Sequence, residues 1–406
     1  MIAAMWFVLA CTAVTVRDRV AGSDPVADPV TEEVPGVDDT GGDTAVEEEE
    51  KTDEYGCSSI FDPDTFPSYD VEISDDEWRA IQNEYAVYDG SKLYHPAISF
   101  SDGKKTLGGV SLRLKGNEGY SWGVPKMQMV VSFVEENEDQ RYHGVRHIAF
   151  DAPWYDTTLL HNRLASIALH ELGVPAPCAN SAQLYINGEF YGVYAAMEQL
   201  DHEYLERNFG KDAADGNLYK YGYELANNAG ADTTDINTFW ATADPATLAS
   251  LGDTNQWVDE WAAEAVVSDV DGYWCCGHNY YIYAHPTQGL IFIPWDLDAT
   301  YNYVGTPYVD PLAYPYYDYL PHEKAILNTV EGKARFLQKV AEYRERLDPA
   351  AYAERNRAWS EQIDDAMKGD TRSYFTYTTW RASIANQADF FDARDRYLEA
   401  WLDAQE

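Results

Sequence analysis

Residues 271–298 gather carboxylate and amide side chains around two short strands that are predicted to form a hairpin. Asp271 and Asn279 stand before the first strand, and Asp296 and Asp298 stand after the second. Because antiparallel strands bring their outer ends side by side, these oxygen-bearing side chains should converge. Such oxygens bind hard cations, and Mg²⁺ in particular takes one or two carboxylates together with substrate phosphates. The sequence therefore predicts a site for a metal ion and a nucleotide at the open end of this hairpin.

The order carboxylate, amide, carboxylate is also found in protein kinases, where one Asp accepts the proton of the substrate hydroxyl and an Asn and a second Asp hold Mg²⁺. By that order, Asp271 is the catalytic candidate, and Asn279, Asp296 and Asp298 are candidate metal ligands. The alternative is a solvated hairpin with acidic ends, which is an ordinary feature of a chain with 69 Asp and Glu residues. The spacing of these residues does not separate the two interpretations.

The composition limits the class of protein. The chain has 406 residues, 45% of them hydrophobic and 14% aromatic, which is enough for a sizeable core in one large two-lobed domain or in two to three ordinary ones. A formal charge of −40 would repel nucleic acids and anionic membrane surfaces. Neither is expected as a partner.

The first residues predict export. Residues 1–16 are apolar but too short to span a bilayer, so residues 1–19 are expected to be an export signal. The motif VLAC at 8–11 resembles a bacterial lipobox, in which Cys11 becomes the lipidated first residue of the mature protein. A hydrophobic leader that is cleaved elsewhere is the alternative. We expect the protein at the bacterial cell surface, in contact with the membrane only through a lipid anchor at Cys11.

An acidic linker should follow the export signal. Residues 20–54 contain thirteen Asp or Glu residues, one Lys, three Pro and no aromatic residue. This composition does not bury enough apolar surface to offset the entropy lost on ordering, so residues 20–56 are predicted to be disordered and residues 57–406 to be folded. Four cysteines remain after Cys11, an even number compatible with two disulfides whose pairing the sequence leaves open: Cys57, Cys178, Cys275 and Cys276.

The hydrophobic pattern predicts strands first and helices last. Expected strands are 69–73, 94–100, 107–115, 126–134 and 217–221, with a hairpin over 182–198 that turns at Asn187-Gly188. Expected helices are one capped by Ser74, one capped by Thr157 or Thr158 and ended by Gly173, one capped by Asp201, one from 257, and three near 323–347, 349–367 and 378–403. Residues 222–250 should form a long surface insertion. We predict an α+β fold with a β-rich lobe (57–200), a helix-rich lobe (201–406) and a cleft between them.

Few basic residues are available to neutralise a triphosphate, because the chain has only 29 Lys and Arg residues. The basic residues with few competitors for this role are Lys115, Lys126, Arg163 and Lys220, of which Lys126 and Lys220 are the chosen candidates. Lys126 begins a predicted strand, from which its ammonium group can reach phosphates as a kinase strand lysine does. Glu198 ends the Asn-Gly hairpin and is expected in the segment that joins the lobes. The alternatives are a surface lysine at Lys126 and a solvated carboxylate at Glu198.

Four patches of the chain resemble the spore-coat protein H (CotH) kinase family of secreted atypical kinases. They are LRLKGN with PKMQMVVSF (112–133), LYINGEFYGVYAAMEQLD (184–201), GNLYK (216–220), and HNYYIY with FIPWDLD (278–298). The resemblance implies a two-lobed, kinase-like fold that transfers phosphate from ATP to Ser or Thr of exported proteins, with Mg²⁺ as the metal.

The resemblance also implies a role for each site residue. Asp271 would act on the substrate hydroxyl, Asp296 and Asn279 would hold Mg²⁺, and Asp298 would be an alternative to Asp296. The sequence departs from the family by placing Trp274-Cys275-Cys276-Gly277 between Asp271 and Asn279. This longer gap leaves Asp269 as a competing choice for the base.

Two other classes of function compete with the kinase. A surface adhesion or structural binding protein would keep the fold without catalysis and use tyrosines for contact: Tyr301, Tyr303, Tyr308, Tyr314, Tyr316, Tyr317 and Tyr319. A Ca²⁺-dependent surface protein would use the same acidic residues without ATP, but no EF-hand spacing is present. Stabilisation by Mg·ATP distinguishes a kinase from either.

Overall fold

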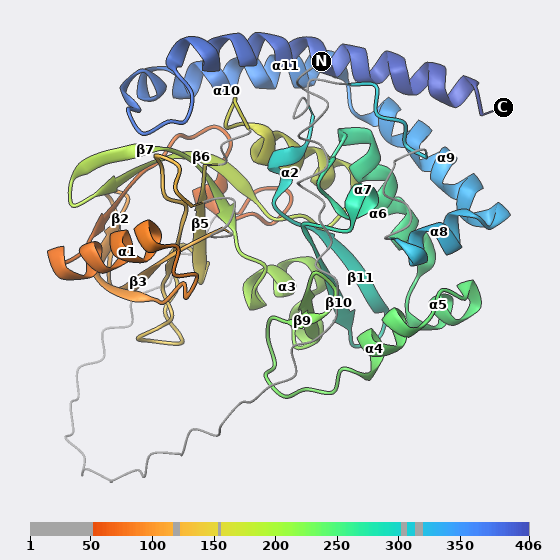
Figure 1. Ribbon diagram of the computed structural model, residues 1–406, viewed down its shortest axis with the longest axis horizontal. Helices are drawn as coiled ribbons and strands as arrows, with labels where there is room; N and C mark the ends of the chain where they lie inside the picture. The colour runs from red at the N-terminus through yellow and green to blue at the C-terminus, as the bar shows by residue number, and fades with distance from the viewer. Residues whose placement is uncertain (1–51, 117–121, 153–155, 302–306, 313–319, 406) are drawn as a thin grey trace. The chain divides into compact units, whose positions relative to one another are not determined.

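The computed structural model describes residues 52–116, 122–152, 156–301, 307–312 and 320–405 (Figure 1). The predicted export signal, Cys11 and the acidic linker as far as residue 51 lie outside these residues. Within the described part of the chain, every helix is too short or too polar to cross a lipid bilayer.

The N-terminal half folds into a closed barrel of seven strands in the order β1-β2-β3-β4-β5-β7-β6. The strands are β1 Ser68–Glu72, β2 His95–Ser101, β3 Thr106–Leu114, β4 Met129–Ser132, β5 His147–Asp151, β6 Ala179–Ile186 and β7 Glu189–Glu198. All neighbours are antiparallel except β1 and β6, whose parallel pairing closes the barrel. The predicted strands are therefore confirmed, whereas β5 was not predicted.

The β6–β7 hairpin turns at Asn187-Gly188, as the sequence predicted. Both residues have positive φ angles, 52° at Asn187 and 75° at Gly188, which a two-residue type I′ turn requires. Asparagine and glycine adopt this left-handed conformation at the lowest cost. The turn therefore sets the register that places Glu198 at the end of β7.

Two helices pack with the barrel. In α1 (Asp75–Val87), the Ser74 hydroxyl accepts a hydrogen bond from the Glu77 N–H at 3.3 Å, as predicted. The cap expected for α2 (His161–Leu172) was wrong, because the Asp156 carboxylate, rather than a threonine, accepts from the His161 N–H at 3.0 Å. Gly173 ends α2 with a φ of 80°, as predicted.

A second sheet lies in the C-terminal half, with strand order β11-β10-β8-β9. Its strands are β8 Asn217–Lys220, β9 Glu224–Leu225, β10 Tyr280–His285 and β11 Gly289–Pro294. Strands β10 and β11 form the predicted hairpin, in which Tyr280 pairs with Pro294. This sheet and α3 (His202–Phe209) bury apolar side chains together with barrel strands β4, β5 and β7, among them Met197, Ile293 and Trp295. That contact brings the end of β5 and the end of β11 into one region.

Residues 222–250, predicted as a long surface insertion, are mostly exposed and contain two short helices that were not predicted. Helix α4 (Thr234–Ala241) buries Ile236 and Phe239, and α5 (Pro245–Leu251) buries Leu248. Asp244 caps α5 by accepting from the Thr247 N–H at 2.9 Å. Each helix has too few apolar residues to produce a recognisable period.

The remaining helices are α6 Thr254–Val267, α7 Tyr273–Cys276, α8 Pro321–Leu327, α9 Val330–Arg346, α10 Pro349–Gly369 and α11 Tyr377–Asp403. The helix predicted near 323–347 is divided into α8 and α9 at Thr329, whose hydroxyl caps α9 by accepting from the Gly332 N–H. Helices α10 and α11 pack against each other, and α10 also contacts β7 (Figure 1). The α+β class is confirmed, and the two-lobed arrangement stays a prediction.

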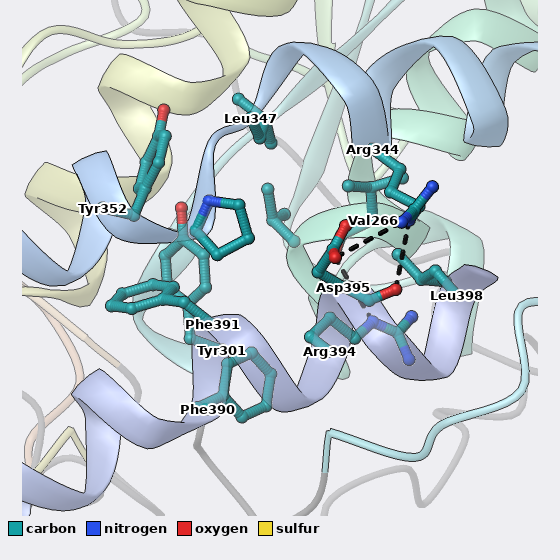
Figure 2. Close-up of a pocket in the computed structure, with 12 residues that line it drawn as sticks. Val266, Tyr301, Arg344, Leu347, Tyr352, Phe390, Phe391, Arg394, Asp395 and Leu398 are labelled. Atoms are coloured by element: carbon teal, nitrogen blue, oxygen red, sulfur yellow. Dashed lines mark hydrogen bonds and ion pairs between the residues drawn. The ribbon is translucent and has the colours of Figure 1, made fainter. Parts of the chain in front are cut away.

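Helices α6, α9 and α11 surround an apolar pocket (Figure 2). Tyr301, Phe390 and Phe391 lie on one side of it, and an ion pair of 2.8 Å between the Arg344 Nε and Asp395 lies on the other. None of the predicted site residues lines this pocket. It is therefore a feature of helix packing that is separate from the candidate site.

Candidate functional site

Three aspartates from two parts of the fold meet at the contact between the barrel and the second sheet. Asp151 ends β5, and Asp296 and Asp298 follow β11. Asp296 has a φ of 58°, which turns the chain into the 3₁₀ turn Leu297–Ala299. Carboxylate oxygens of the three residues lie within 4.8 Å of one another, close enough to share one metal ion. We call these three residues the carboxylate cluster.

Lys115 lies between two members of the carboxylate cluster. Its Nζ donates to Asp151 Oδ1 at 3.0 Å and to Asp296 Oδ1 at 2.9 Å. The Lys115 N–H donates to the Gln128 carbonyl at 2.8 Å, which extends the β3–β4 ladder and fixes where the side chain starts. One ammonium faces three carboxyl groups, so the cluster retains a capacity for further positive charge.

The pKa values of the cluster reflect this imbalance. Burial and the charge of Asp296 raise the pKa of Asp151 to about 6, although Lys115 opposes the shift. Burial, Asp296 and Asp151 hold the pKa of Asp298 well above its usual range. Asp298 Oδ1 is buried and accepts no hydrogen bond from any described residue. A cation would lower the cost of ionising both groups, and the residues therefore fit a metal ion.

The first turn of α2 supports the cluster from behind. The ring Nδ1 of His161 lies 2.7 Å from the backbone oxygen of Asp298, and Asn162 Nδ2 donates to Asp151 Oδ2 at 3.2 Å. Both side chains are buried. His161 and Asn162 therefore hold the backbone of one aspartate and the carboxylate of another.

Asp271 and Asn279 contact each other at the start of the β10–β11 hairpin. Asn279 Nδ2 donates to Asp271 Oδ2 at 2.9 Å, and His278 Nδ1 lies 3.4 Å from the same oxygen. The charge of Asp271 contributes to the raised pKa of Asp298, so the two carboxylates lie near each other. Asn279 contacts Asp271 rather than the carboxylate cluster, and its proposed metal contact stays a prediction.

Asp269, the competing choice for the base, is fully buried beneath Asp271. Its Oδ1 accepts from the Asp271 N–H at 3.3 Å. Burial, Glu264 and Asp271 raise its pKa well above the usual range. A base that contacts substrate must reach solvent, and this favours Asp271.

Lys220 ends β8 and lies near Asp296. Burial lowers the pKa of Lys220, and Asp296 is the strongest opposing charge. Its Nζ lies 5.1 Å from the centre of the Tyr221 ring, which in turn stacks on His278. The contact of Lys220 with a triphosphate stays a prediction.

Lys126 lies elsewhere, and this corrects the prediction that it reaches the phosphates. Its Nζ forms an ion pair with Asp370, just after α10, and donates to the Val193 carbonyl at 2.9 Å. Only 4% of the Lys126 side chain and 0% of the Asp370 side chain are exposed. The ammonium group is thus neutralised inside the protein, and the lysine that reaches the carboxylate cluster is Lys115.

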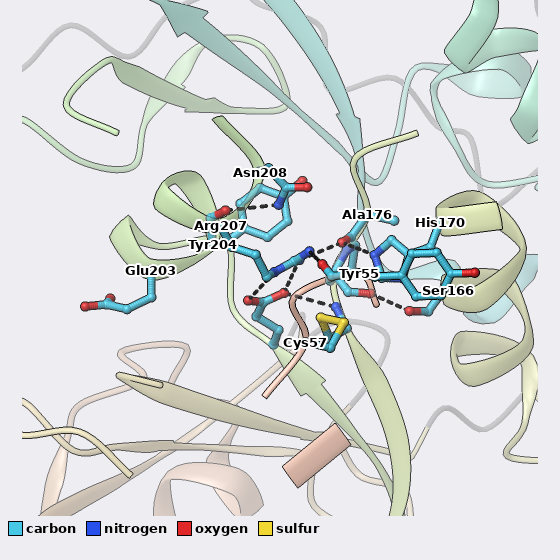
Figure 3. Close-up of polar contacts among 12 residues, drawn as sticks. Tyr55, Cys57, Ser166, His170, Ala176, Glu203, Tyr204, Arg207 and Asn208 are labelled. Carbon is cyan, nitrogen blue, oxygen red and sulfur yellow. Dashed lines mark hydrogen bonds and ion pairs between the residues drawn. A yellow bond between two sulfur atoms is a disulfide. The ribbon is translucent and has the colours of Figure 1, made fainter. Parts of the chain in front are cut away.

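Glu198 also has a structural contact instead of the expected one. It accepts from Arg207 Nη2 at 2.6 Å and from the Cys178 N–H at 3.0 Å. Figure 3 shows Arg207 beside the Cys57–Cys178 disulfide, with Tyr55 close by. Glu198 therefore helps to hold the segment around residue 57 against β6, away from the carboxylate cluster.

Of the two disulfides that the cysteine count allowed, the described residues contain Cys57–Cys178, and Cys275 and Cys276 are not part of it. The Sγ of Cys276 lies 3.5 Å from Asp271 Oδ1. Residues 274–277, which lengthen the gap between Asp271 and Asn279, belong to the short helix α7 and its C-cap. Helix α7 carries Cys275 and Cys276 to the edge of the site.

The sequence analysis missed Asp151 and Asn162, and it named Lys115 among the basic candidates without choosing it over Lys126. Lys115 lies in the motif LRLKGN and is one of few basic residues, which was a usable signal. No pattern in the sequence pointed to Asp151, because β5, the strand that carries it, was not predicted. Asn162 was taken as part of an amphipathic helix and is instead buried beneath the cluster.

Comparisons with known proteins identify the family of the chain. Residues 111–398 match the family described as CotH kinase protein. A curated relative, the inner spore coat protein H of Bacillus subtilis (strain 168), is 26% identical over 41% of this chain and 52% of its own length. The chain thus spans about half of that relative.

Two solved structures are similar to part of the chain at 11% identity. One comes from the complex of HipA, HipB and operator DNA of the Shewanella oneidensis MR-1 toxin-antitoxin system, with 66% of this chain and 60% of that chain covered and a TM-score of 0.29. The other is the Helicobacter pylori proinflammatory kinase CtkA, with 71% and 95% covered and a TM-score of 0.27. The family match extends over most of the folded residues and includes every member of the carboxylate cluster. The chain belongs to the CotH kinase protein family.

Proposed function

We propose that this protein is an active kinase that transfers phosphate from Mg·ATP to Ser or Thr residues of proteins outside the cell. The observation that carries the proposal is the carboxylate cluster of Asp151, Asp296 and Asp298 with Lys115 between its members. Phosphoryl transfer is catalysed mainly by positioning and by neutralisation of charge, and the cluster supplies both.

Each side chain has a distinct task in this proposal. Asp296 and Asp298 hold Mg²⁺, and Asp151 is a further carboxylate for the same ion. When bound, the ion neutralises charge that develops on the phosphates. Lys115 and Lys220 provide positive charge beside it, which a lysine does as a flexible point charge.

Asp271 accepts the proton of the substrate hydroxyl and orients that group. Asn279 holds the Asp271 carboxylate by a hydrogen bond of 2.9 Å, which fixes its direction toward the substrate. His278 lies on the solvent side, with 48% of its side chain exposed, and shares the same carboxylate oxygen. Asn279 thus acts on the base, and in this proposal it contacts the metal only through water.

The protein substrate and the location remain proposals that rest on the sequence. An apolar leader, Cys11 and an acidic linker favour an exported protein at the bacterial cell surface. A formal charge of −40 favours substrate segments that are basic or neutral over acidic ones.

The decisive experiment measures the melting temperature of the full chain with and without Mg·ATP, together with transfer of the γ-phosphate. We expect Mg·ATP to raise the melting temperature of the wild-type protein and to leave that of Asp296→Asn unchanged. Asp365→Asn is the matched control, because the Asp365 side chain is 99% exposed. Phosphate transfer retained by Asp296→Asn would refute the assignment.

Absence of a nucleotide shift in every variant would favour the binding-protein alternative. That alternative used seven tyrosines, of which only Tyr301 and Tyr308 lie among the described residues. Tyr301 is buried against Phe391, and Tyr308 is 64% exposed. The other five tyrosines lie outside the described residues, so this alternative stays a prediction, and the carboxylate cluster is the observation that favours the kinase.

A further inference from the structure

A histidine at the start of β2 contacts two carboxylates of α1. Helix α1 packs against β2 and β3 (Figure 1), and His95 is the first residue of β2. Its ring Nδ1 lies 2.8 Å from Glu77 Oε2, and its Nε2 lies 2.9 Å from Glu84 Oε1. Glu84 follows Glu77 by about two helical turns, so one ring bridges much of the length of α1. We call these three residues the histidine clamp.

The two bonds of the histidine clamp need one proton more than a neutral imidazole supplies. A neutral ring donates from one nitrogen and accepts at the other, whereas an ionised carboxylate only accepts. Both contacts are therefore hydrogen bonds only when His95 is an imidazolium or one glutamate is protonated. Burial opposes the charged ring, but the hydrogen bonds and charges of Glu77 and Glu84 raise the pKa of His95 above its usual value of 6.5. The clamp is thus complete in acid and loses a bond at higher pH.

The bonds of the histidine clamp join α1 to β2. Strand β3 places the uncharged Leu112 opposite His95, with Arg113 next in sequence. The connection from α1 to β2 contains Asp89 and Lys92. The carboxylates on the two ring nitrogens both belong to α1. Loss of a proton from the clamp therefore weakens the contact between α1 and β2.

The last turn of α1 contacts three consecutive residues that precede β4. The Tyr85 hydroxyl donates to the Val124 carbonyl at 2.6 Å, and the centre of its ring lies 5.9 Å from that of Trp122. Tyr88 is the C-cap of α1, and a Cβ at Gly123 would lie 1.9 Å from the Tyr88 hydroxyl oxygen. This close approach and a φ of 86° both require glycine at that position. Helix α1 therefore fixes the course of this segment.

Trp122 connects this segment to Lys115. Its indole Nε1 donates to the Lys115 carbonyl at 3.0 Å, and only 4% of Trp122 is exposed. The Lys115 N–H donates to the Gln128 carbonyl, so both backbone groups of the lysine are held. A shift of α1 would therefore move the backbone from which the Lys115 side chain reaches Asp151 and Asp296.

We propose that α1 positions Lys115 through Tyr85 and Trp122, and that the histidine clamp makes this positioning depend on pH. The inference rests on the proposed function only for its effect on phosphate transfer. With the clamp complete, α1 holds the Trp122 segment, and Lys115 keeps its place between the carboxylates. With one bond lost, α1 and the backbone of Lys115 are held less firmly. Tyr85 and Trp122 are positioning residues, because they act on the carboxylate cluster through Lys115.

The first test measures amide hydrogen exchange in the full chain by mass spectrometry, and it needs no kinase activity. Trp122→Phe keeps a ring and removes the indole N–H, so the peptide that contains the Lys115 amide should exchange about fivefold faster. Tyr85→Phe, which removes only a hydroxyl, should speed the same peptide to a smaller degree. Trp240→Phe removes an indole bond to the Gly222 carbonyl and is the matched control, which should leave that peptide unchanged. Unchanged exchange at Lys115 in both Trp122→Phe and Tyr85→Phe would overturn the positioning role.

The second test measures the melting temperature between about pH 5.5 and about pH 8.5. Since the pKa of His95 is raised in the folded protein, the clamp stabilises the fold below the unfolded value and loses this effect as the pH rises through the folded value. Across the range, the wild-type protein should lose about 2 °C or more relative to His95→Gln. His147→Gln is the matched control, because His147 contacts one carboxylate, on Asp201, through one nitrogen. A difference between wild type and His95→Gln that is constant with pH would overturn the clamp.

The third test joins the clamp to phosphate transfer. The wild-type rate should exceed that of His95→Gln by about threefold or more near pH 6 and equal it near pH 8.5. In a Trp122→Phe background, His95→Gln should have no pH-dependent effect on the rate. A pH-dependent effect that persists there would overturn the coupling through Trp122. A wild-type protein that neither transfers phosphate nor shifts with Mg·ATP would refute the kinase, whereas the exchange and melting results would still decide the positioning of Lys115 by α1.

Discussion

Lys115 and Lys126 lie at the two ends of the connection between β3 and β4, and they have opposite surroundings. Lys115 faces the three carboxyl groups of the carboxylate cluster, and 25% of the Asp296 side chain reaches solvent. Lys126 faces one carboxylate, Asp370, and both side chains are buried. The sequence environment of the two lysines is similar, and the burial and number of their partners differ.

This difference in the number of carboxyl partners distinguishes a ligand-binding site at Lys115 from a structural ion pair at Lys126. A buried pair of one ammonium and one carboxylate is neutral, so it has no electrostatic reason to take up a ligand. A single ammonium among three carboxyl groups leaves negative charge that a metal ion can neutralise. The ratio of charges, together with a route to solvent, therefore identifies Lys115 as the functional lysine.

The largest effect should come from removing the ammonium group of the carboxylate cluster. Lys115→Met should lower phosphate transfer by about 100-fold or more, because a positive charge that acts on the phosphates is lost. The measurement is the initial rate of γ-phosphate transfer at saturating Mg·ATP. Lys126→Met is the matched control and should transfer phosphate within about threefold of the wild-type rate at a temperature where it is folded. Equal losses of phosphate transfer in Lys115→Met and Lys126→Met would contradict the functional difference between the two lysines.

The effects of the two lysine substitutions on stability should be the reverse of their effects on phosphate transfer, with the larger loss at Lys126. Lys126→Met should lower the free energy of unfolding by about 3–5 kcal/mol, because Asp370 would remain charged and buried with backbone N–H groups of Val193 and Arg372 but without the ammonium group. Urea unfolding measures this, with Lys104→Met, at an exposed lysine, as the control. The double variant Lys126→Met with Asp370→Asn should recover part of the loss. A destabilisation below about 1 kcal/mol would show that the ion pair is not structural.

The metal-free carboxylate cluster should make stability depend on pH. The pKa of Asp151 is raised to about 6 in the folded protein, above its usual value of 3.8, so the folded state binds the proton more tightly. Stability from this group is present below about pH 4 and is lost as the pH rises to about 6, by up to about 1.4 kcal/mol per pH unit. Unfolding in urea with EDTA measures the slope. Asp151→Asn should flatten it, and an unchanged slope would contradict the assignment.

The smallest effect should come from the support behind the cluster. Asn162→Ala removes a hydrogen bond of 3.2 Å to Asp151 and should cost about 1 kcal/mol of stability. It should also reduce the thermal shift with Mg·ATP, because the Asp151 carboxylate is less firmly held. Asn208→Ala, which removes a bond to a backbone carbonyl in α3, is a control that should leave the nucleotide shift intact. A full nucleotide shift in Asn162→Ala would remove Asn162 from the site.

Local signals in the sequence were enough to predict most of the elements. Asn187-Gly188 predicted a turn, Ser74 and Asp201 predicted helix starts, and each occupies the expected position. These signals act within a few residues, so they do not depend on the rest of the fold. The division between α8 and α9 was missed, because residues 323–347 continue the helical pattern through the break.

The candidate site was predicted only where its residues are close in sequence. Asp271, Asn279, Asp296 and Asp298 lie on one hairpin, so its geometry brings them to one end. Asp151 and Lys115 reach the site from the barrel through packing of β5 and β7 against the second sheet, which no local pattern encodes. Lys126 was misassigned for the same reason, because its partner Asp370 is 244 residues away in sequence.

The Cys57–Cys178 disulfide has a mechanical consequence. It joins the chain just before the barrel to the start of β6, and Arg207 reinforces the junction by donating to the Tyr55 carbonyl at 3.2 Å and the Ala176 carbonyl at 3.0 Å. Tension applied to the chain ahead of Cys57 would pass through the sulfur–sulfur bond into β6 instead of into β1. Strand β1, which closes the barrel by pairing with β6, would then not be the strand that receives the pull directly.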